Sequence, residues 1–149
     1  EFLKVKQEAG SVVNYDKGQK ISNAQVFGLD VSVLIPAALA DVINDGNKSD
    51  VKAKIIVEGA NICMSYETEA ELEGQGIVVV PDFVANAGGV ISSYVEYIGG
   101  TVDQMWEMVE SKVVANTQLV LKRAKEKGIT ARAAALEISQ ERIKTKRGF

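Results

Sequence analysis

The sequence predicts an α/β fold: a short parallel sheet with flanking helices, followed by two carboxyl-terminal helices. Three apolar, β-rich runs at residues 31–35, 54–57 and 77–80 are separated by segments with helical patterns. Strands buried on both faces that alternate with helices are typical of a parallel sheet. Beyond Gly100 the apolar residues recur at helical spacing only, which predicts the two terminal helices.

The composition excludes several classes of function. At 149 residues with a formal charge of −3, the chain is about one domain long and is too acidic for nucleic acid to be an expected partner. One cysteine and no histidine exclude internal disulfides, Cys/His zinc sites and Ser-His-Asp catalysis. No apolar run approaches the roughly 18 residues of a membrane span, and no signal peptide is evident, so we expect a cytoplasmic protein.

Two further predictions concern chemistry. No pair of carboxylates stands in an obviously apolar setting, which acid–base catalysis would need in order to separate their pKa values. Cys63 has no neighbouring base in the sequence, and we expect an inert thiol. The sequence therefore predicts no catalytic residue and no metal ligand.

Local signals place the elements before the sheet. Apolar residues at helical spacing predict the end of a helix over residues 1–9, stopped at Gly10, and an extended piece follows at residues 11–15. A turn is expected at residues 16–18. Ser22 can cap a short helix that ends at Gly28.

The strands are bounded by proline, glycine and capping residues. Pro36 breaks the first strand, and a short helix is expected over residues 39–43. Ser65 can cap a helix over residues 66–73 that ends at Gly74. Pro81 then stops the third strand.

Glycines divide the rest of the chain. Residues 86–89 (NAGG) open a helix that ends at residues 99–100, where the double glycine is equally well interpreted as a helix C-cap or as a hinge. Thr101 and Gln104 form a capping-box pattern at the start of a long helix. Gly128 ends that helix, and a second one begins near residue 130.

Small and polar residues follow each strand, at the edge of a parallel sheet where ligands bind. These residues are Ala37, Ala38, Asn61 and Asn86. Val90 and Ser93 lie one turn apart on one face of the helix that follows. Taken alone, the NAGG segment is better interpreted as a loop entering a helix, and Ser93 and Asn61 as a surface hydroxyl and a turn residue.

Three strand tips in register make a ligand site the better interpretation. The segments 35–38 (IPAA), 57–61 (VEGAN) and 81–90 (PDFVANAGGV) closely resemble, in order and spacing, the carboxyl-terminal part of the glutamate dehydrogenases, within the glutamate/leucine/phenylalanine/valine dehydrogenase family. The likeness covers almost the whole chain. It implies that residues 1–149 are the carboxyl-terminal part of a dinucleotide-binding domain, a partial Rossmann-like sheet with terminal helices at 101–149.

The resemblance also implies roles for the candidate residues. Four positions match the nicotinamide-ribose side of an NAD or NADP site: Ala37, Ala38, Asn61 and Asn86. Asn86 also matches a position near the substrate, while Val90 and Ser93 match residues that touch its carbon chain and its side-chain carboxylate.

The implied activity is oxidative deamination of L-glutamate to 2-oxoglutarate and ammonia. The phosphate-binding G-x-G-x-x-G turn and the family's catalytic Lys and Asp have no counterpart here, so we expect the isolated chain to be inactive. The implied partners are an amino-terminal substrate domain and further subunits of a homohexamer. Two alternatives stay open: a non-catalytic binding or assembly module, and a sibling leucine or phenylalanine dehydrogenase.

Overall fold

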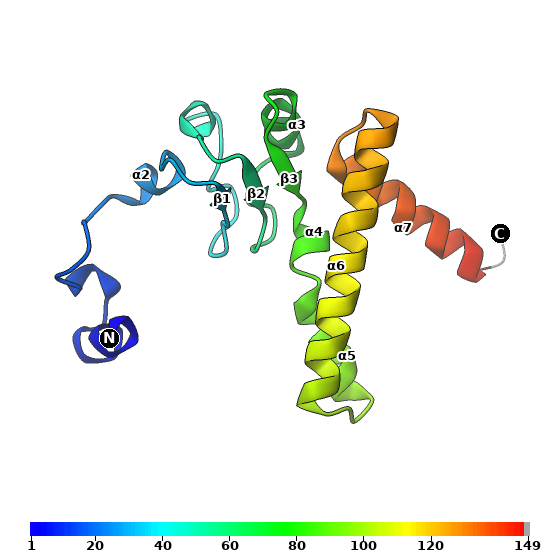
Figure 1. The fold of residues 1–149 in the computed structure, drawn as a ribbon, viewed down its shortest axis with the longest axis horizontal. Coiled ribbons are helices and arrows are strands. Elements are labelled where there is room, and N and C mark those ends of the chain that lie inside the picture. Colours follow the sequence, from blue (N-terminus) through cyan, green and yellow to red (C-terminus); the bar gives the residue numbers. More distant parts are fainter. Residues whose placement is uncertain (148–149) are drawn as a thin grey trace.

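The computed structural model describes residues 1–147 and contains a three-stranded parallel sheet in the order β1-β2-β3 (Figure 1). The strands are β1 (Val33–Leu34), β2 (Ile55–Val57) and β3 (Val78–Val80). Val33 pairs with Ile55, which pairs with Val78. The position and parallel sense of all three strands are confirmed, although each strand is shorter than its apolar run.

Helices flank the sheet and form the carboxyl-terminal third of the chain. They are α1 (Phe2–Ala9), α2 (Asn23–Phe27), α3 (Tyr66–Gly74), α4 (Asp82–Ala85), α5 (Gly88–Tyr97), α6 (Val102–Lys127) and α7 (Ala131–Arg147), with short 3-10 turns η1 (Val12–Asn14) and η2 (Lys48–Asp50). Figure 1 shows α6 beside α4 and α5, and α7 extending away from it. The predicted Ser22 cap of α2 is formed, as part of a capping box with Gln25, and so is the predicted capping box of α6, which confirms where these helices begin.

Two apolar cores hold these elements together. The first lies under the sheet and contains Leu34, Ile43, Ala53, Ile56, Met64, Leu72 and Val79. The second joins the end of β3 and α4 to α6 and α7, and contains Val80, Val84, Val120, Ala131, Ala134, Ala135 and Ile138. The alanines let α7 pack closely, as its composition predicts.

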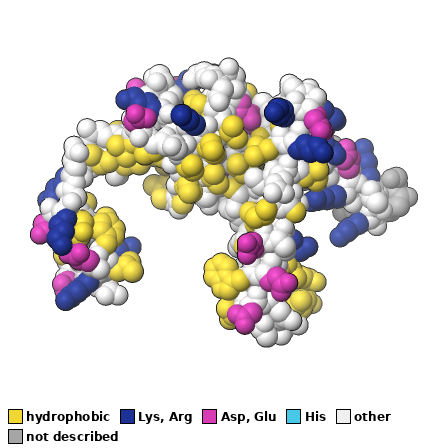
Figure 2. All heavy atoms as spheres, viewed as in Figure 1, with side chains coloured by type: hydrophobic (Ala, Val, Ile, Leu, Met, Phe, Trp, Pro, Cys, Tyr) yellow, Lys and Arg dark blue, Asp and Glu magenta, His cyan; other side chains and the backbone are white. Residues whose placement is uncertain are grey.

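One face of the sheet is open, contrary to the prediction that both faces are buried. Leu34, Ile56 and Val79 point into the first core, while Val33 and Val78 on the opposite face are 45% and 41% exposed. Figure 2 shows hydrophobic side chains gathered in the middle of the molecule, over the region of the sheet. The alternation of buried and exposed residues is that of a half-covered sheet.

Two local predictions in the first half are wrong. Residues 39–43 form no helix, because Asp41 takes a positive φ of 52° and the N–H groups of Asp41 and Ile43 donate to the carbonyls of Ile62 and Cys63. Residues 11–15 are not extended, since the Ser11 side chain accepts from Val13 N–H and starts the turn η1. Hydrogen bonds to residues distant in sequence prevent a helix at residues 39–43, whereas a local cap prevents an extended segment at residues 11–15.

The double glycine forms a helix C-cap. Gly99 has a φ of 72° and its N–H donates to the carbonyl of Glu96, while Gly100 N–H donates to the carbonyl of Val95 at 2.9 Å. These are the two hydrogen bonds of a Schellman motif. The end of α5 is therefore explained by its cap, and a hinge at this point stays a prediction.

Replacing Gly100 with Ala is expected to lower Tm by several degrees. A Cβ there would lie 2.5 Å from Cγ1 of the buried Val95, and overpacking of this kind costs about 1–3 kcal/mol. Gly89→Ala is the matched control, because its Cβ meets nothing within 4 Å and alanine favours a helix. Circular dichroism melting curves measure both, and equal Tm values for the two variants would contradict the packing argument.

Candidate functional site

The carboxyl ends of β1 and β2 meet closely. The N–H groups of Gly59 and Ala60 both donate to the carbonyl of Pro36, at 2.9 and 3.0 Å. A Cβ on Gly59 would lie 2.9 Å from the Cβ of Ala37, so this contact requires glycine. Ala37 therefore lies against the tip of β2, and Ala38 follows it on the surface.

Asn61 and Asn86 are in direct contact across the ends of β2 and β3. The Asn86 side-chain nitrogen Nδ2 donates to Oδ1 of Asn61 at 2.6 Å, although the two residues are 25 positions apart. This bond uses one end of each amide, so the other ends can contact a ligand. The prediction that Ala37, Asn61 and Asn86 share one edge of the sheet is confirmed, while their roles toward a ligand stay predictions.

Val90 and Ser93 lie on an exposed face of α5. The Val90 side chain is 76% exposed, and Ser93 Oγ donates to the carbonyl of Gly89 at 3.2 Å. Ser92 Oγ donates to the same carbonyl at 2.8 Å. If the Ser93 hydroxyl turns toward a ligand, the Gly89 carbonyl keeps its hydrogen bond from Ser92. The rotation therefore costs little free energy.

A buried ionic cluster lies next to these loops, around Arg132 at the start of α7. Its Nε donates to both carboxylate oxygens of Glu69, at 2.9 and 2.7 Å. Its Nη2 donates to Glu58 Oε2 at 3.1 Å and to Asp82 Oδ1 at 2.9 Å. Glu58 directly follows β2, and Asp82 follows β3 after Pro81, so the cluster joins two strand tips to α3 and α7.

Aromatic rings enclose the guanidinium. The centre of the Arg132 guanidinium lies 4.5 Å from the centroid of the Tyr66 ring and 5.3 Å from that of Phe83. These contacts are cation–π interactions, which strengthen as the groups leave water. They shield the ionic cluster from solvent and attach Tyr66, the first residue of α3, to α7.

The carboxyl groups of the cluster differ in charge state. Burial, with the nearby charge of Glu69, raises the pKa of Glu58 to about 8. Burial alone would also raise the pKa of Asp82, but hydrogen bonds from the N–H groups of Ile62 and Phe83 and from Arg132 hold it below its ordinary value. Since three carboxylates surround one guanidinium, a proton on Glu58 reduces the excess negative charge.

This cluster contradicts the prediction that no carboxylates stand in an apolar setting. The sequence signal was available: acidic residues stand at the ends of two strands, at Glu58 and Asp82, and Arg132 interrupts an alanine-rich helix face. Arg and Glu are rarely buried unless paired, so an arginine among buried alanines predicts an acidic partner. The identity of that partner could not be predicted, because Glu58 and Arg132 are 74 positions apart.

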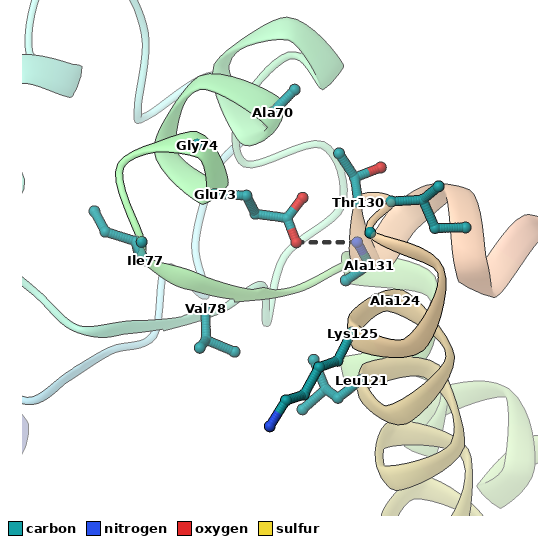
Figure 3. Close-up of a pocket in the computed structure, with 13 residues that line it drawn as sticks. Ala70, Glu73, Gly74, Ile77, Val78, Leu121, Ala124, Lys125, Thr130 and Ala131 are labelled. Carbon is teal, nitrogen blue, oxygen red and sulfur yellow. Dashed lines mark hydrogen bonds between the residues drawn. The ribbon is translucent and has the colours of Figure 1, made fainter.

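A pocket of about 460 Å³ lies elsewhere, between α3 and the α6–α7 connection (Figure 3). Glu73 Oε1 accepts a hydrogen bond from the backbone N–H of Ala131 at 3.0 Å, and burial raises the pKa of Glu73. The pocket borders Val78, the first residue of β3. It is therefore separate from the strand tips, which lie at the opposite ends of the strands.

Residues 1–147 contain neither a metal-binding cluster nor a membrane-spanning helix. No group of three or more His, Cys, Asp or Glu side chains in this part of the chain could hold a metal ion. None of its helices combines the length and apolar composition needed to cross a membrane.

Comparisons with known proteins identify the family. The family model described as Glutamate/Leucine/Phenylalanine/Valine dehydrogenase matches residues 1–148. The chain belongs to this family. The glutamate dehydrogenase of Aeropyrum pernix is 42% identical over 153 residues, which cover 96% of the chain and 37% of that relative.

Two further relatives agree with this assignment. The NADP-specific glutamate dehydrogenase of Saccharolobus shibatae is 50% identical over 95 residues, which cover 64% of the chain and 22% of that relative. The crystal structure of a hetero-hexameric glutamate dehydrogenase from Thermus thermophilus, in a leucine-bound form, matches with a TM-score of 0.80 and 31% identity, over 95% of the chain and 34% of that protein. The chain thus spans between about a fifth and two fifths of the length of these family members.

The strand tips fit part of a dinucleotide. Ala37 and Ala38 are small and exposed, and the free ends of the Asn61 and Asn86 amides offer a donor and an acceptor beside them. No Lys or Arg occurs in segments 36–38, 59–61 or 83–90. This edge suits the neutral nicotinamide ribose and not the phosphates.

The pKa of Glu58 predicts how stability depends on pH. Its folded value of about 8 lies above the reference of 4.5, so the folded state binds an extra proton between these values. The contribution of Glu58 to stability is full below about pH 4.5 and is lost as pH rises toward 8, by at most about 1.4 kcal/mol per pH unit. Urea unfolding midpoints from pH 6 to 8.5 should fall, and Glu58→Gln should flatten that fall; an unchanged slope would contradict the assignment.

Proposed function

We propose that this chain is the carboxyl-terminal part of the NAD(P)-binding domain of a glutamate dehydrogenase, which oxidatively deaminates L-glutamate to 2-oxoglutarate and ammonia. The observation that supports it best is the Asn61–Asn86 contact at the carboxyl edge of the sheet, in a family whose members compared above are glutamate dehydrogenases. Ligands of open parallel sheets bind at this edge.

The residues of this chain bind and orient the reactants. Bound NAD or NADP supplies the acceptor for the hydride that leaves the substrate. Ala37 and Ala38 leave room for the nicotinamide ribose, while Asn61 and Asn86 hydrogen-bond to it with the free ends of their amides. Orientation of this kind is a large part of catalysis when two reactants must meet.

Substrate specificity arises on α5. With the α-carbon of glutamate near Asn86, its methylenes pass the exposed Val90 and its side-chain carboxylate reaches the hydroxyl of Ser93. Val90 and Ser93 lie one turn apart on α5, so they face one direction, and Asn86 ends α4 shortly before that helix. A hydroxyl beyond a small apolar residue suits a ligand that is apolar in the middle and anionic at its end.

The remaining chemistry belongs to other parts of the protein. An amino-terminal substrate domain would supply the catalytic Lys and Asp, and the nucleotide phosphates would bind at a glycine-rich turn before residue 1. The open apolar face of the sheet supports further chain packing there, since exposed apolar patches mark contact surfaces. The whole protein is proposed to be a cytoplasmic homo-oligomer, a hexamer by family resemblance, with NAD or NADP as cofactor.

Two alternatives are weaker. A non-catalytic binding or assembly module would keep the fold but would not require polar amides to meet at the strand tips. A leucine or phenylalanine dehydrogenase would need an apolar pocket for the substrate side chain, whereas Ser93 presents a hydroxyl on an exposed helix face.

The isolated chain is expected to show no glutamate-dependent reduction of NAD or NADP. It contains neither the phosphate-binding turn nor the family's catalytic Lys and Asp. Absorbance at the wavelength of the reduced nicotinamide measures the activity of a purified sample. Clear turnover would refute the assignment of catalysis to other parts of the protein.

In the full-length enzyme, Ser93→Ala should lower kcat/KM for glutamate tenfold to a hundredfold. A hydrogen bond to an ionised carboxylate contributes about 1.5 to 3 kcal/mol, and this variant removes it. Norvaline has no such carboxylate, so its kcat/KM should hardly fall, and nucleotide affinity should stay unchanged. Steady-state kinetics with both amino acids give the ratio.

Ser92→Ala is the matched control for Ser93. The Ser92 hydroxyl donates to the same Gly89 carbonyl but belongs to a different face of α5. Its removal should leave the glutamate-to-norvaline ratio intact. If Ser93→Ala also left that ratio intact and weakened nucleotide binding instead, Ser93 would be structural and the proposed glutamate specificity would lose its support.

A further inference from the structure

We propose that Asp82 is a positioning residue for the Asn61–Asn86 pair, an inference that rests on the proposed role of this pair in the cofactor site. Asp82 is buried and begins α4, one residue beyond the end of β3 and between the two loops that the asparagines belong to. Its side chain accepts a hydrogen bond from the residue after Asn61, and its backbone carbonyl accepts one from the N–H of Asn86.

Ile62, the residue after Asn61, has a strained backbone. Its φ is 52°, in the left-handed region that β-branched side chains avoid. Such conformations persist only where surrounding contacts impose them. Here the Ile62 N–H donates to Asp82 Oδ2 at 2.9 Å, and its carbonyl accepts from the N–H of Asp41 at 2.8 Å.

The Asp82 carboxylate is itself fixed in direction. Its other oxygen, Oδ1, accepts from the N–H of Phe83 at 2.8 Å and from Arg132 Nη2 at 2.9 Å. The N–H of Asp82 donates to Glu58 Oε2 at 2.9 Å. With both oxygens and the backbone engaged, the carboxylate cannot turn without breaking charge-assisted hydrogen bonds.

Asp82 also holds the second asparagine. The backbone N–H of Asn86 donates to the Asp82 carbonyl at 2.8 Å, as the last bond of α4. On the other side, the N–H of Ala60, the residue before Asn61, donates to the carbonyl of Pro36 at 3.0 Å. Hydrogen bonds from both neighbouring residues thus hold Asn61 in place, and a hydrogen bond from its own backbone N–H holds Asn86. The two side-chain amides therefore meet.

The test compares three variants of the full-length enzyme. Asp82→Ala removes the acceptor of the Ile62 N–H. Asp82→Asn keeps one oxygen that can accept from the Ile62 N–H, but its amide nitrogen replaces the oxygen that accepts from Phe83 and Arg132, so it serves as a partial rescue variant. Glu69→Gln weakens the pairing of Arg132 yet leaves the bond between Asp82 and Ile62 in place, so it controls for loss of stability alone.

Two measurements are made on each variant. Hydrogen exchange followed by mass spectrometry of peptides covering residues 59–65 reports the Ile62 amide. Steady-state kinetics give the KM for the nucleotide and the glutamate-to-norvaline ratio. For Asp82→Ala we expect exchange at Ile62 to be about tenfold to a hundredfold faster, the size of one lost hydrogen bond to a charged group.

The same variant should raise the nucleotide KM about tenfold or more and leave the glutamate-to-norvaline ratio unchanged, because Ser93 is untouched. Asp82→Asn should restore part of both quantities, because it keeps an acceptor for the Ile62 N–H. Glu69→Gln should lower Tm while leaving exchange at Ile62 and the nucleotide KM near those of the parent enzyme.

The outcomes separate this inference from the proposed function. Unchanged exchange at Ile62 in a folded Asp82→Ala variant would overturn the positioning role. An equal rise of KM in Glu69→Gln would also overturn it, because any loss of stability would then suffice. Faster exchange with an unchanged nucleotide KM would support the positioning of Asn61 and refute its place in the cofactor site.

Discussion

The buried guanidinium of Arg132 is the interaction on which the arrangement of the carboxyl-terminal half depends. It joins α7 to Glu58 after β2, to Glu69 in α3 and to Asp82 after β3. Leaving such a charge without its partners costs about 3–5 kcal/mol, a large part of a domain's stability. The four elements therefore keep one relative placement or lose much of their stability together.

The cluster also explains how the surface loops acquire a defined shape. Loops at a sheet edge make few apolar contacts, and their backbone groups would otherwise be free to move. Here the Glu58 and Asp82 carboxylates accept backbone N–H groups of the loops as well as the guanidinium of Arg132. The carboxyl groups that pair with the buried guanidinium thus also hold the backbone of the surface loops.

Much of the fold could be predicted because its signals are local. Capping residues such as Ser22 and Thr101, and the glycines that end α1 and α6, act within one helical turn, so sequence spacing is enough to locate them. The candidate residues at the strand tips were found because parallel strands bring their ends to one edge. The absent helix at residues 39–43, the unpredicted α4 and the ionic cluster depend on contacts between distant segments.

A purely apolar cluster could have joined the same four elements. Replacing a buried ion pair by well-packed apolar residues is often neutral or stabilising, so stability alone does not require charges here. An apolar side chain at position 82, however, would offer no acceptor to the Ile62 N–H, whose left-handed backbone has no other fastening on that side. A hydrogen-bond acceptor at position 82 is therefore needed to fix the direction of the Ile62 peptide group, which is the proposed determinant of the place of Asn61.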